Sequence, residues 1–398
     1  MAEGLTFRRR VARRLHYWAD WRCVEPVVVI ESDDWGMERR ACSQLLRLYG
    51  EPSEWADEEL ETAEDLTRLY EVLEHYRDEH DRPACFTANF VVANPDYDAI
   101  AKNDFTSYTD IPISRNDALR RHWLDGLGRR VFAPQYHGRS HFWPEAWLSD
   151  LRLQVRGARA LFDRKCHGGL SLLKGQGWRY HSEYMDWKTG QERSSDELQK
   201  WLQGGLDFFQ EMFGFFPRST IASHYILTPS MARAWRVAGG EFVQGTDYRI
   251  LRRADDQAQI LSHTLGESSS EGLLMLGRTV KFDPRPQRPL QGTDAALRRI
   301  TDCFKNHIPA IIDTHRINFT GAWSDSSLQA LDDLLKRLKP FQPRFLTSVE
   351  VGEAIAQNGT YHDTWTGATR HLTPLNRTWR SMLRAQLRPY NSFLMAKN

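Results

Sequence analysis

The chain has 398 residues, of which 41% are hydrophobic and 26% are charged, values typical of a globular protein rather than a disordered or fibrous one. Lys plus Arg number 53 against 52 Asp plus Glu, so the net charge favours no polyanionic partner, and we expect no nucleic acid binding. The five cysteines are scattered and never form a CxxC pair, which argues against a disulfide framework and a thiolate zinc site.

Residues 1–25 form a basic segment with five arginines between positions 8 and 14, interleaved with apolar side chains. A helix here would be amphipathic, suited either to peripheral contact with an anionic membrane or to packing over the bottom of a domain. The segment has no apolar core typical of a secretory signal, and no run of about 18 apolar residues occurs in the chain. We therefore expect a cytoplasmic location.

Strand signals alternate with amphipathic helix signals over residues 26–358. The expected strands cover residues 27–30, 84–92, 130–136, 218–222, 241–245, 273–282, 310–314 and 344–346. The expected helices lie near residues 66–76, 144–164, 195–213, 229–238, 293–306, 326–338 and 348–357. Ser195 is the expected N-cap of its helix, and Pro229 suits a first helical turn.

This alternation predicts βα units and a mainly parallel sheet. Seven or eight such units would close into a barrel, with an active site at the C-terminal ends of the strands. Residues 94–118 and 167–194 lack periodicity and are expected to be insertions that wall a cleft. Residues 359–398 are expected to form an irregular arm rather than a second domain.

The first polar motif, ESDDWG, occupies residues 31–36 directly after the first strand signal. Adjacent carboxylates resist joint ionisation unless a positive charge lies beside them. A divalent cation would meet this need, with one aspartate binding the ion and the other staying ionised as a base. The alternative is a turn in which Asp33 or Asp34 caps the following helix.

The second motif, HGRSH, occupies residues 137–141. On a helix, His137 and His141 would share one face about 5–6 Å apart, which suits a single ion. No Glu follows the first His, so the base must come from elsewhere. Two His and one carboxylate with open positions are a common catalytic metal arrangement.

The third motif, DTHR, ends the strand signal at residues 310–314. Side chains alternate along a strand, so Asp313 and His315 are expected on the same side. His315 would then protonate a leaving group, or else serve as a hydrogen-bonded structural His. His181, His224 and His263 lack a partner pattern and are expected to be structural or exposed.

The order of these motifs resembles the polysaccharide deacetylases of carbohydrate esterase family 4, whose first two motifs read roughly TFDDG and H-[ST]-x-x-H. The wording IESDDWG with a later DTHRIN looks closer still to a divergent, polysaccharide deacetylase-like branch. The resemblance covers about residues 26–350 and is most specific at the first two motifs. It implies an irregular (β/α)7 barrel.

Transferred residue by residue, the resemblance implies that Asp33 is the general base and His315 the general acid. It also implies that Asp34, His137 and His141 bind one divalent ion. Zinc suits this nitrogen-rich ligand set best, although manganese, iron, cobalt or nickel would also fit.

The later motifs depart from the family pattern. The family steadies its base with an Arg followed by Pro-Pro-Tyr, and here Arg218 in FPRST is the expected counterpart. The family's Leu-x-His is replaced, so Asp313 either makes the acyl pocket polar, pairs with Arg316 or orients His315. Asp247 stands where the family often has an acidic residue that orients the acid His.

The leading hypothesis is an N-deacylase acting on an amino sugar or sugar-like amide, with acetyl, formyl or another polar acyl group. Trp35, Trp143 and Arg316 are the expected substrate contacts, with rim packing as the alternative for the two tryptophans. The rival hypotheses are a non-catalytic carbohydrate-binding protein on the same barrel and another metal hydrolase. A glycosidase would need a second carboxylate about 5–10 Å from the first, for which Asp313 or Glu31 is a candidate.

Overall fold

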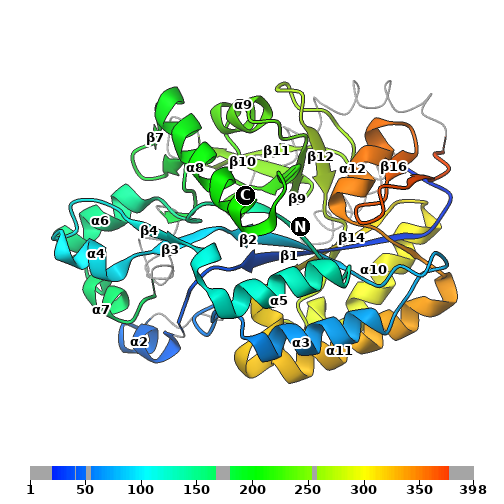
Figure 1. Cartoon of the computed structure of the whole chain (residues 1–398), viewed down its shortest axis with the longest axis horizontal. Helices are drawn as coiled ribbons and strands as arrows, with labels where there is room; N and C mark the ends of the chain where they lie inside the picture. Colours follow the sequence, from blue (N-terminus) through cyan, green and yellow to red (C-terminus); the bar gives the residue numbers. More distant parts are fainter. Residues whose placement is uncertain (1–19, 41, 51–54, 167–179, 253–257, 376–398) are drawn as a thin grey trace, which may run out of the picture.

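The computed structural model describes residues 20–40, 42–50, 55–166, 180–252 and 258–375 (Figure 1). The basic N-terminal segment falls mainly outside these residues. The first expected strand forms β1 (Val27–Trp35), which continues past the valine run through the ESDDW residues and is buried along its whole length. A strand that is covered on both faces is typical of a parallel sheet.

The central sheet has nine strands, and every pairing in it is parallel. Its main path runs β12-β9-β8-β5-β2-β1-β14-β13, with β15 pairing to β1. Besides β1, its strands are β2 (Phe86–Val91), β5 (Phe132–Gly138), β8 (Ser219–Ile221), β9 (Phe242–Gly245), β12 (Leu274–Gly277), β13 (Val280–Lys281), β14 (Ala310–His315) and β15 (Arg344–Phe345). The prediction of an α/β fold with a parallel sheet is confirmed.

The strand expected over residues 273–282 is divided between the two ends of this sheet. Its first half, β12, pairs with β9, whereas its second half, β13, pairs with β14. Between them, the Arg278 amide donates to Gly245 O at 2.6 Å and the Thr279 amide donates to Ile311 O at 2.9 Å. A two-residue step of the chain therefore joins the two ends of the strand order, and the sheet is curled (Figure 1).

Apart from a helix over residues 117–128 that the sequence did not predict, the main helices lie close to their expected positions, and they cover the outside of the sheet (Figure 1). Those on the main sheet are α3 (Ala63–Glu74), α5 (Asp117–Gly128), α8 (Ser195–Phe213), α9 (Pro229–Val237), α10 (Thr293–Lys305), α11 (Ser324–Leu338) and α12 (Ser348–Ala356). Pro229 begins α9 as predicted. The N-cap of α8 is Ser194 rather than Ser195, because Ser194 and Glu197 form a capping box there.

A smaller group of helices lies to one side, at the left of Figure 1, with a hydrophobic core of its own. It contains α2 (Ser43–Leu48), α4 (Tyr97–Lys102), α6 (Pro144–Arg152) and α7 (Ala158–Asp163). The helix expected over residues 144–164 is interrupted, and α7 restarts after Gly157, which has a φ of 80°. Residues 94–118 are partly ordered into α4 and the short pair β3 (Ala93–Pro95) and β4 (Asp110–Pro112).

Three further two-stranded pairs lie outside the central sheet, and one of them begins the expected irregular arm. They are β6 (Met185–Asp186) with β7 (Gln191–Glu192), β10 (Tyr248–Arg252) with β11 (Ala258–Ser262), and β16 (Thr360–His362) with β17 (Thr369–His371). The start of residues 359–398 is therefore a hairpin, and residues 376–398 lie outside the described chain. Among the described residues, no helix is both long and apolar enough to cross a bilayer.

A buried ion-pair network attaches this hairpin to the sheet. Arg82, just before β2, binds both carboxylate oxygens of Glu350 in α12 at 2.8 and 2.7 Å, and its Nη1 also donates to Asp363 at 3.0 Å. The three side chains are at most 3% exposed. Removal of one partner would leave a buried charge uncompensated, so a single substitution in this network should be strongly destabilising.

We expect Arg82→Met to lower the free energy of unfolding by about 3–5 kcal/mol, because Glu350 then keeps a buried charge without its bidentate partner. Urea titration followed by circular dichroism measures this loss. The double variant Arg82→Met/Glu350→Gln should recover part of it, because the stranded charge is removed. A single-variant loss below about 1 kcal/mol would contradict the stabilising role.

Candidate active site

The three polar motifs meet at one edge of the sheet because the strands that bear them are parallel. β1 ends with Asp33 and Asp34, β14 ends with His315, and β5 carries His137 near its end. In the register of β1 and β14, Asp33 lies opposite His315. The C-terminal edge of such a sheet is the usual place for an active site.

A local irregularity of β1 brings two consecutive aspartates into the same cavity. Successive side chains of a regular strand point to opposite faces. Here the pairing of β1 with β2 shifts register between Ser32 and Trp35, and Asp34 adopts a φ of 73°. Asp33 and Asp34 consequently both line the cavity. A positive φ at a non-glycine residue is costly and is typical of functional sites.

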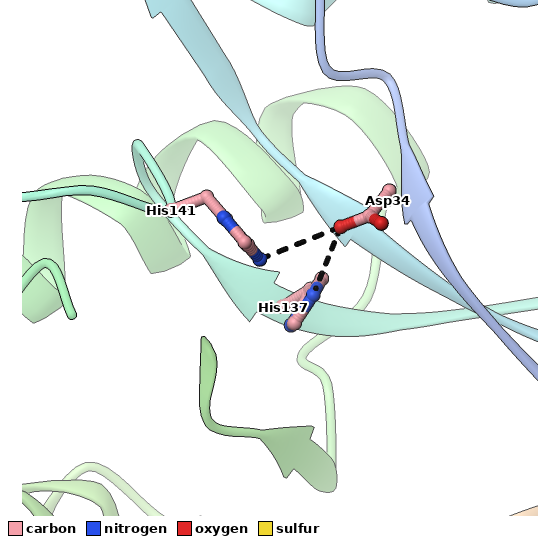
Figure 2. Close-up of side chains that lie close together, drawn as sticks. All are labelled: Asp34, His137 and His141. Carbon is pink, nitrogen blue, oxygen red and sulfur yellow. Dashed lines mark ion pairs between the residues drawn. The ribbon is translucent and has the colours of Figure 1, made fainter. Parts of the chain in front are cut away.

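Asp34, His137 and His141 form the closest potential ligand set (Figure 2). Asp34 Oδ1 lies 3.3 Å from His137 Nε2 and 3.4 Å from His141 Nε2. This oxygen is buried and has no hydrogen-bond partner among the described residues. The Nδ1 atom of His137 lies 3.0 Å from the carbonyl of Ile221, which directs the Nε2 lone pair toward Asp34.

The electrostatics of this triad differ between its members: Asp34 is ionised and His141 is neutral, whereas burial lowers the pKa of His137 but its contacts with Asp34 and Asp33 outweigh this and raise it. Burial raises the pKa of Asp34, but the imidazoles of His137 and His141 outweigh it and hold the pKa well below its usual value. Burial and the neighbouring His137 hold the pKa of His141 well below its usual value, so its imidazole is neutral. A carboxylate and a neutral imidazole are the protonation states that metal ligands require.

The HGRSH motif does not form the expected helix. His137 belongs to β5, Gly138 ends that strand with a φ of 120°, and His141 lies in the following loop with a φ of 68°. The two rings still come together, with centroids 4.7 Å apart. Their i, i+4 spacing therefore works through a tight strand-to-loop turn rather than through a shared helix face.

Asp33 is held by Arg278, a residue to which the sequence analysis assigned no role. Arg278 donates to both carboxylate oxygens of Asp33, at 2.6 and 2.8 Å, and Asn89 donates to Oδ1 at 2.8 Å. Burial raises the pKa of Asp33, but the guanidinium outweighs it and lowers the pKa below its usual value. Asp33 is therefore an ionised carboxylate that does not belong to the Asp34 triad.

The role predicted for Arg218 is contradicted. Arg218 lies before β8, at the opposite end of that strand, where it binds Glu241 at 2.7 Å and also contacts Glu353. The signal for Arg278 was present in the sequence as a charged residue inside the apolar strand pattern of residues 273–282. A buried arginine at that position needs acidic partners.

The Arg278 guanidinium also binds Glu31 at 2.6 Å and Asp313 at 2.7 Å, so three carboxylates share one buried cation. Burial raises the pKa of Glu31 to about 7, although Arg278 and a 2.7 Å hydrogen bond from Ser348 limit the rise. Asp313 pairs with Arg278 rather than with Arg316, and it does not line the cavity. The alternatives in which Asp313 makes the acyl pocket polar or pairs with Arg316 are therefore not realised, whereas its Oδ1 lies 4.0 Å from His315 Nδ1, as the alternative that it orients His315 requires.

Asp33, Asp313 and His315 form a second group compact enough for a metal ion. Arg278 already donates to both Asp33 and Asp313, so a guanidinium supplies the positive charge in that place. The geometry consequently favours one metal site, at Asp34, over a two-metal centre.

His315 lines the cavity beside Asp33 and Asp313. Its Nε2 lies 3.8 Å from Asp33 and its Nδ1 lies 4.0 Å from Asp313. The ring packs edge-on against Trp55 with centroids 5.1 Å apart, and its side chain is 24% exposed. Asp247 is exposed, and no contact joins it to His315 in the described chain, so its predicted orienting role is not realised.

The substrate contacts predicted for Trp35, Trp143 and Arg316 are not accessible. Trp35 and Trp143 are 1% and 4% exposed, and Trp35 packs edge-on against Phe132 in the core. Arg316 is fully buried, binding Glu61 at 3.0 Å and Glu58 at 3.2 Å. None of these three residues lines the cavity.

The cavity wall is built from other aromatic and imidazole side chains. It includes Trp55, Phe142, Tyr180, Tyr225, His181, His224 and the ion pair of Arg39 with Glu58. The rings of His181 and His224, expected to be structural or exposed, stack with centroids 3.7 Å apart. The cavity volume is about 230 Å³, which is below the range of about 300–1,000 Å³ usual for drug-sized ligands.

Comparisons with known proteins give a limited likeness. No protein-family model matches the chain, and no curated protein matches it in sequence. Among solved structures, it is similar to a CE4 family pseudoenzyme from Bacillus anthracis (13% identity, TM-score 0.37), over 82% of this chain and 66% of that one. It is also similar to 4-alpha-glucanotransferase from Thermococcus litoralis (9% identity, TM-score 0.41), over 82% of this chain and 40% of that one.

A third similar structure is the peptidoglycan deacetylase PdaC from Bacillus subtilis (10% identity, TM-score 0.36), over 84% of this chain and 93% of that chain. The chain thus spans just under two thirds of the first of these neighbours and well under half of the second. The three neighbours named are described as a pseudoenzyme, a glucanotransferase and a deacetylase.

Proposed function

We propose that the protein is a metal-dependent hydrolase that removes a small N-acyl group, acetyl or formyl, from an amino sugar or a related amide. We further propose that its curled sheet is the core of an irregular (β/α)7 barrel of the kind found in carbohydrate esterase family 4. One observation carries the functional proposal. The unpartnered, buried Oδ1 of Asp34 faces two imidazole nitrogens, beside a separate, ionised Asp33.

Asp34, His137 and His141 would hold one divalent ion, for which zinc suits the two nitrogen ligands best. When bound, this ion would polarise the amide carbonyl and acidify a water molecule. The three donors leave open positions for both.

Asp33 would accept the proton of the attacking water, since Arg278 keeps its carboxylate ionised and fixed in place. His315 lies across the same cavity with Nε2 3.8 Å from Asp33, and it would deliver a proton to the departing amine. Arg278 would therefore steady the base, which is the role that was expected of Arg218. The stacked His181 and His224 and the ring of Trp55 form walls against which a sugar would pack.

The glycosidase alternative is disfavoured by the acidic residues themselves. Glycoside cleavage needs two carboxylates that flank the substrate. Glu31 and Asp313, the candidates for the second, are buried against Arg278, and neither lines the cavity.

Metal content tests the proposed ligand set. We expect about one ion per chain in the untagged protein after incubation with zinc, and less than a tenth of that in His137→Ala/His141→Ala, because one ligand cannot hold the ion. Elemental mass spectrometry measures both. His371→Ala, which removes an exposed histidine, is the matched control. A wild-type protein that stays metal-free with both zinc and manganese would eliminate the proposed mechanism.

A second prediction separates the base from the ligands. Asp33→Asn should keep its ion but release amine from N-acetyl or N-formyl amino sugars about 10²–10⁴-fold more slowly, since it cannot accept the proton. A fluorogenic amine assay across such a panel gives the rate, and Asp98→Asn at an exposed site is the control. Loss of the ion from Asp33→Asn would mean that Asp33 and Asp34 exchange roles. If wild type releases no amine, the non-catalytic binding protein becomes the better reading.

A further inference from the structure

The loop that carries His141 has no regular secondary structure to fix it. It follows β5 at Gly138 and passes through Arg139 and Ser140 before His141, which has a φ of 68°. The Nε2 atom of His141 lies 3.4 Å from Asp34 Oδ1, and its ring makes no hydrogen bond with the described residues. The ring of His137, by contrast, is anchored by the Ile221 carbonyl at 3.0 Å. Apart from ring packing against His137 and His224, the position of His141 therefore depends on its backbone.

That backbone wraps around the carboxylate of Glu183. The amide of Arg139 donates to Oε2 at 2.9 Å and to Oε1 at 3.1 Å. The amide of Ser140 donates to Oε2 at 2.6 Å, and the amide of His141 donates to the same oxygen at 3.2 Å. The Ser140 hydroxyl lies 3.2 Å from the same oxygen, but its single proton is directed mainly to the Phe142 carbonyl at 2.8 Å. Three consecutive amides that converge in this way form an anion-binding nest, which is filled here by a side chain.

The fit between this carboxylate and the loop is close. Glu183 is fully buried, and a Cβ added to Gly138 would lie 2.6 Å from its Oε1. Two constraints therefore require glycine at position 138. Its φ of 120° disfavours any other residue, and a Cβ would collide with the Glu183 carboxylate. Without the carboxylate, the three amides would lose their shared hydrogen-bond acceptor. Because unsatisfied amides are costly, the loop would be expected to rearrange.

Glu183 also connects the loop that carries His141 with the cavity wall. Its own segment supplies Tyr180 and His181 to that wall. The carbonyl of His181 lies 3.1 Å from His224 Nδ1, and the two rings stack. The segment at residues 180–184 is consequently held to the loops after both β5 and β8.

We propose that Glu183 is a positioning residue of the metal site, which holds residues 138–141 in the one conformation that presents His141 Nε2 to Asp34. This inference rests on the proposed metal-binding function and adds a residue that none of the three sequence motifs contains. Outer residues that orient metal ligands typically change metal affinity 10- to 100-fold when they are removed. Glu183 would act through the backbone of a ligand rather than through its imidazole.

Cobalt(II) titration of the metal-free, full-length protein tests this without any substrate, because the visible spectrum of cobalt reports its ligand geometry. We expect Glu183→Ala to bind cobalt about 10- to 100-fold more weakly and with an altered spectrum. Glu183→Gln keeps one acceptor oxygen in reach of the amides, so it should restore the wild-type spectrum and most of the affinity. Glu192→Gln, at an exposed site on β7, is the matched control.

The outcomes separate the two proposals. If wild type and Glu192→Gln bind cobalt and both Glu183 variants match them in affinity and spectrum, Glu183 has only a structural role and the inference is overturned, even if the melting temperature falls. If Glu183→Ala does not fold, Glu183→Asp takes its place, because its shorter side chain withdraws the carboxylate from the three amides. Weakened cobalt binding by Glu183→Asp then supports the inference, and binding identical to wild type overturns it. If wild type itself does not bind cobalt, the metal-binding function fails first.

Discussion

Three carboxylates, those of Glu31, Asp33 and Asp313, converge on the buried guanidinium of Arg278 at the C-terminal edge of the sheet. They come from β1 and β14, whereas Arg278 lies at the step between β12 and β13. Burial of so many acidic groups is tolerable only beside a fixed positive charge. The same contact therefore holds the ends of the curled sheet together and sets the charge of the proposed base.

Consecutive aspartates acquire different chemistry from this arrangement. Asp33 is satisfied by a cation of the protein and by Asn89, so it is rigid and ionised. Asp34, turned by the irregularity in β1, has an oxygen that the described protein leaves without a hydrogen bond. Two identical side chains with contrasting surroundings are a recurrent way to divide roles within one active site. Here the two aspartates differ because the Arg278 guanidinium contacts Asp33 and not Asp34.

The sequence predicted the elements whose signals are local. The valine run gave β1, the capping pattern and apolar spacing gave α8 over residues 195–213, and the motifs correctly pointed to a shared strand edge. Contacts across the fold were not readable. Arg218 and Arg278 are equally plausible from spacing, and only the closure of the sheet brings the second to Asp33. The histidine spacing suggested a helix because nothing local reveals that Glu183 folds the loop.

The division of residues 273–282 between β12 and β13 affects where the chain tolerates new termini or insertions. Most other connections in the sheet run through helices outside the barrel-like core, and the one from β9 to β12 runs through the β10–β11 pair, so new termini or inserted residues there would disturb mainly the surface. The step at Arg278 and Thr279 is different, because its two amides bond to strands at opposite ends of the sheet order. A break or insertion there would part the ends and withdraw the counter-charge of Asp33 in one event. Circular permutants and domain insertions should accordingly succeed around most of the sheet and fail at this seam.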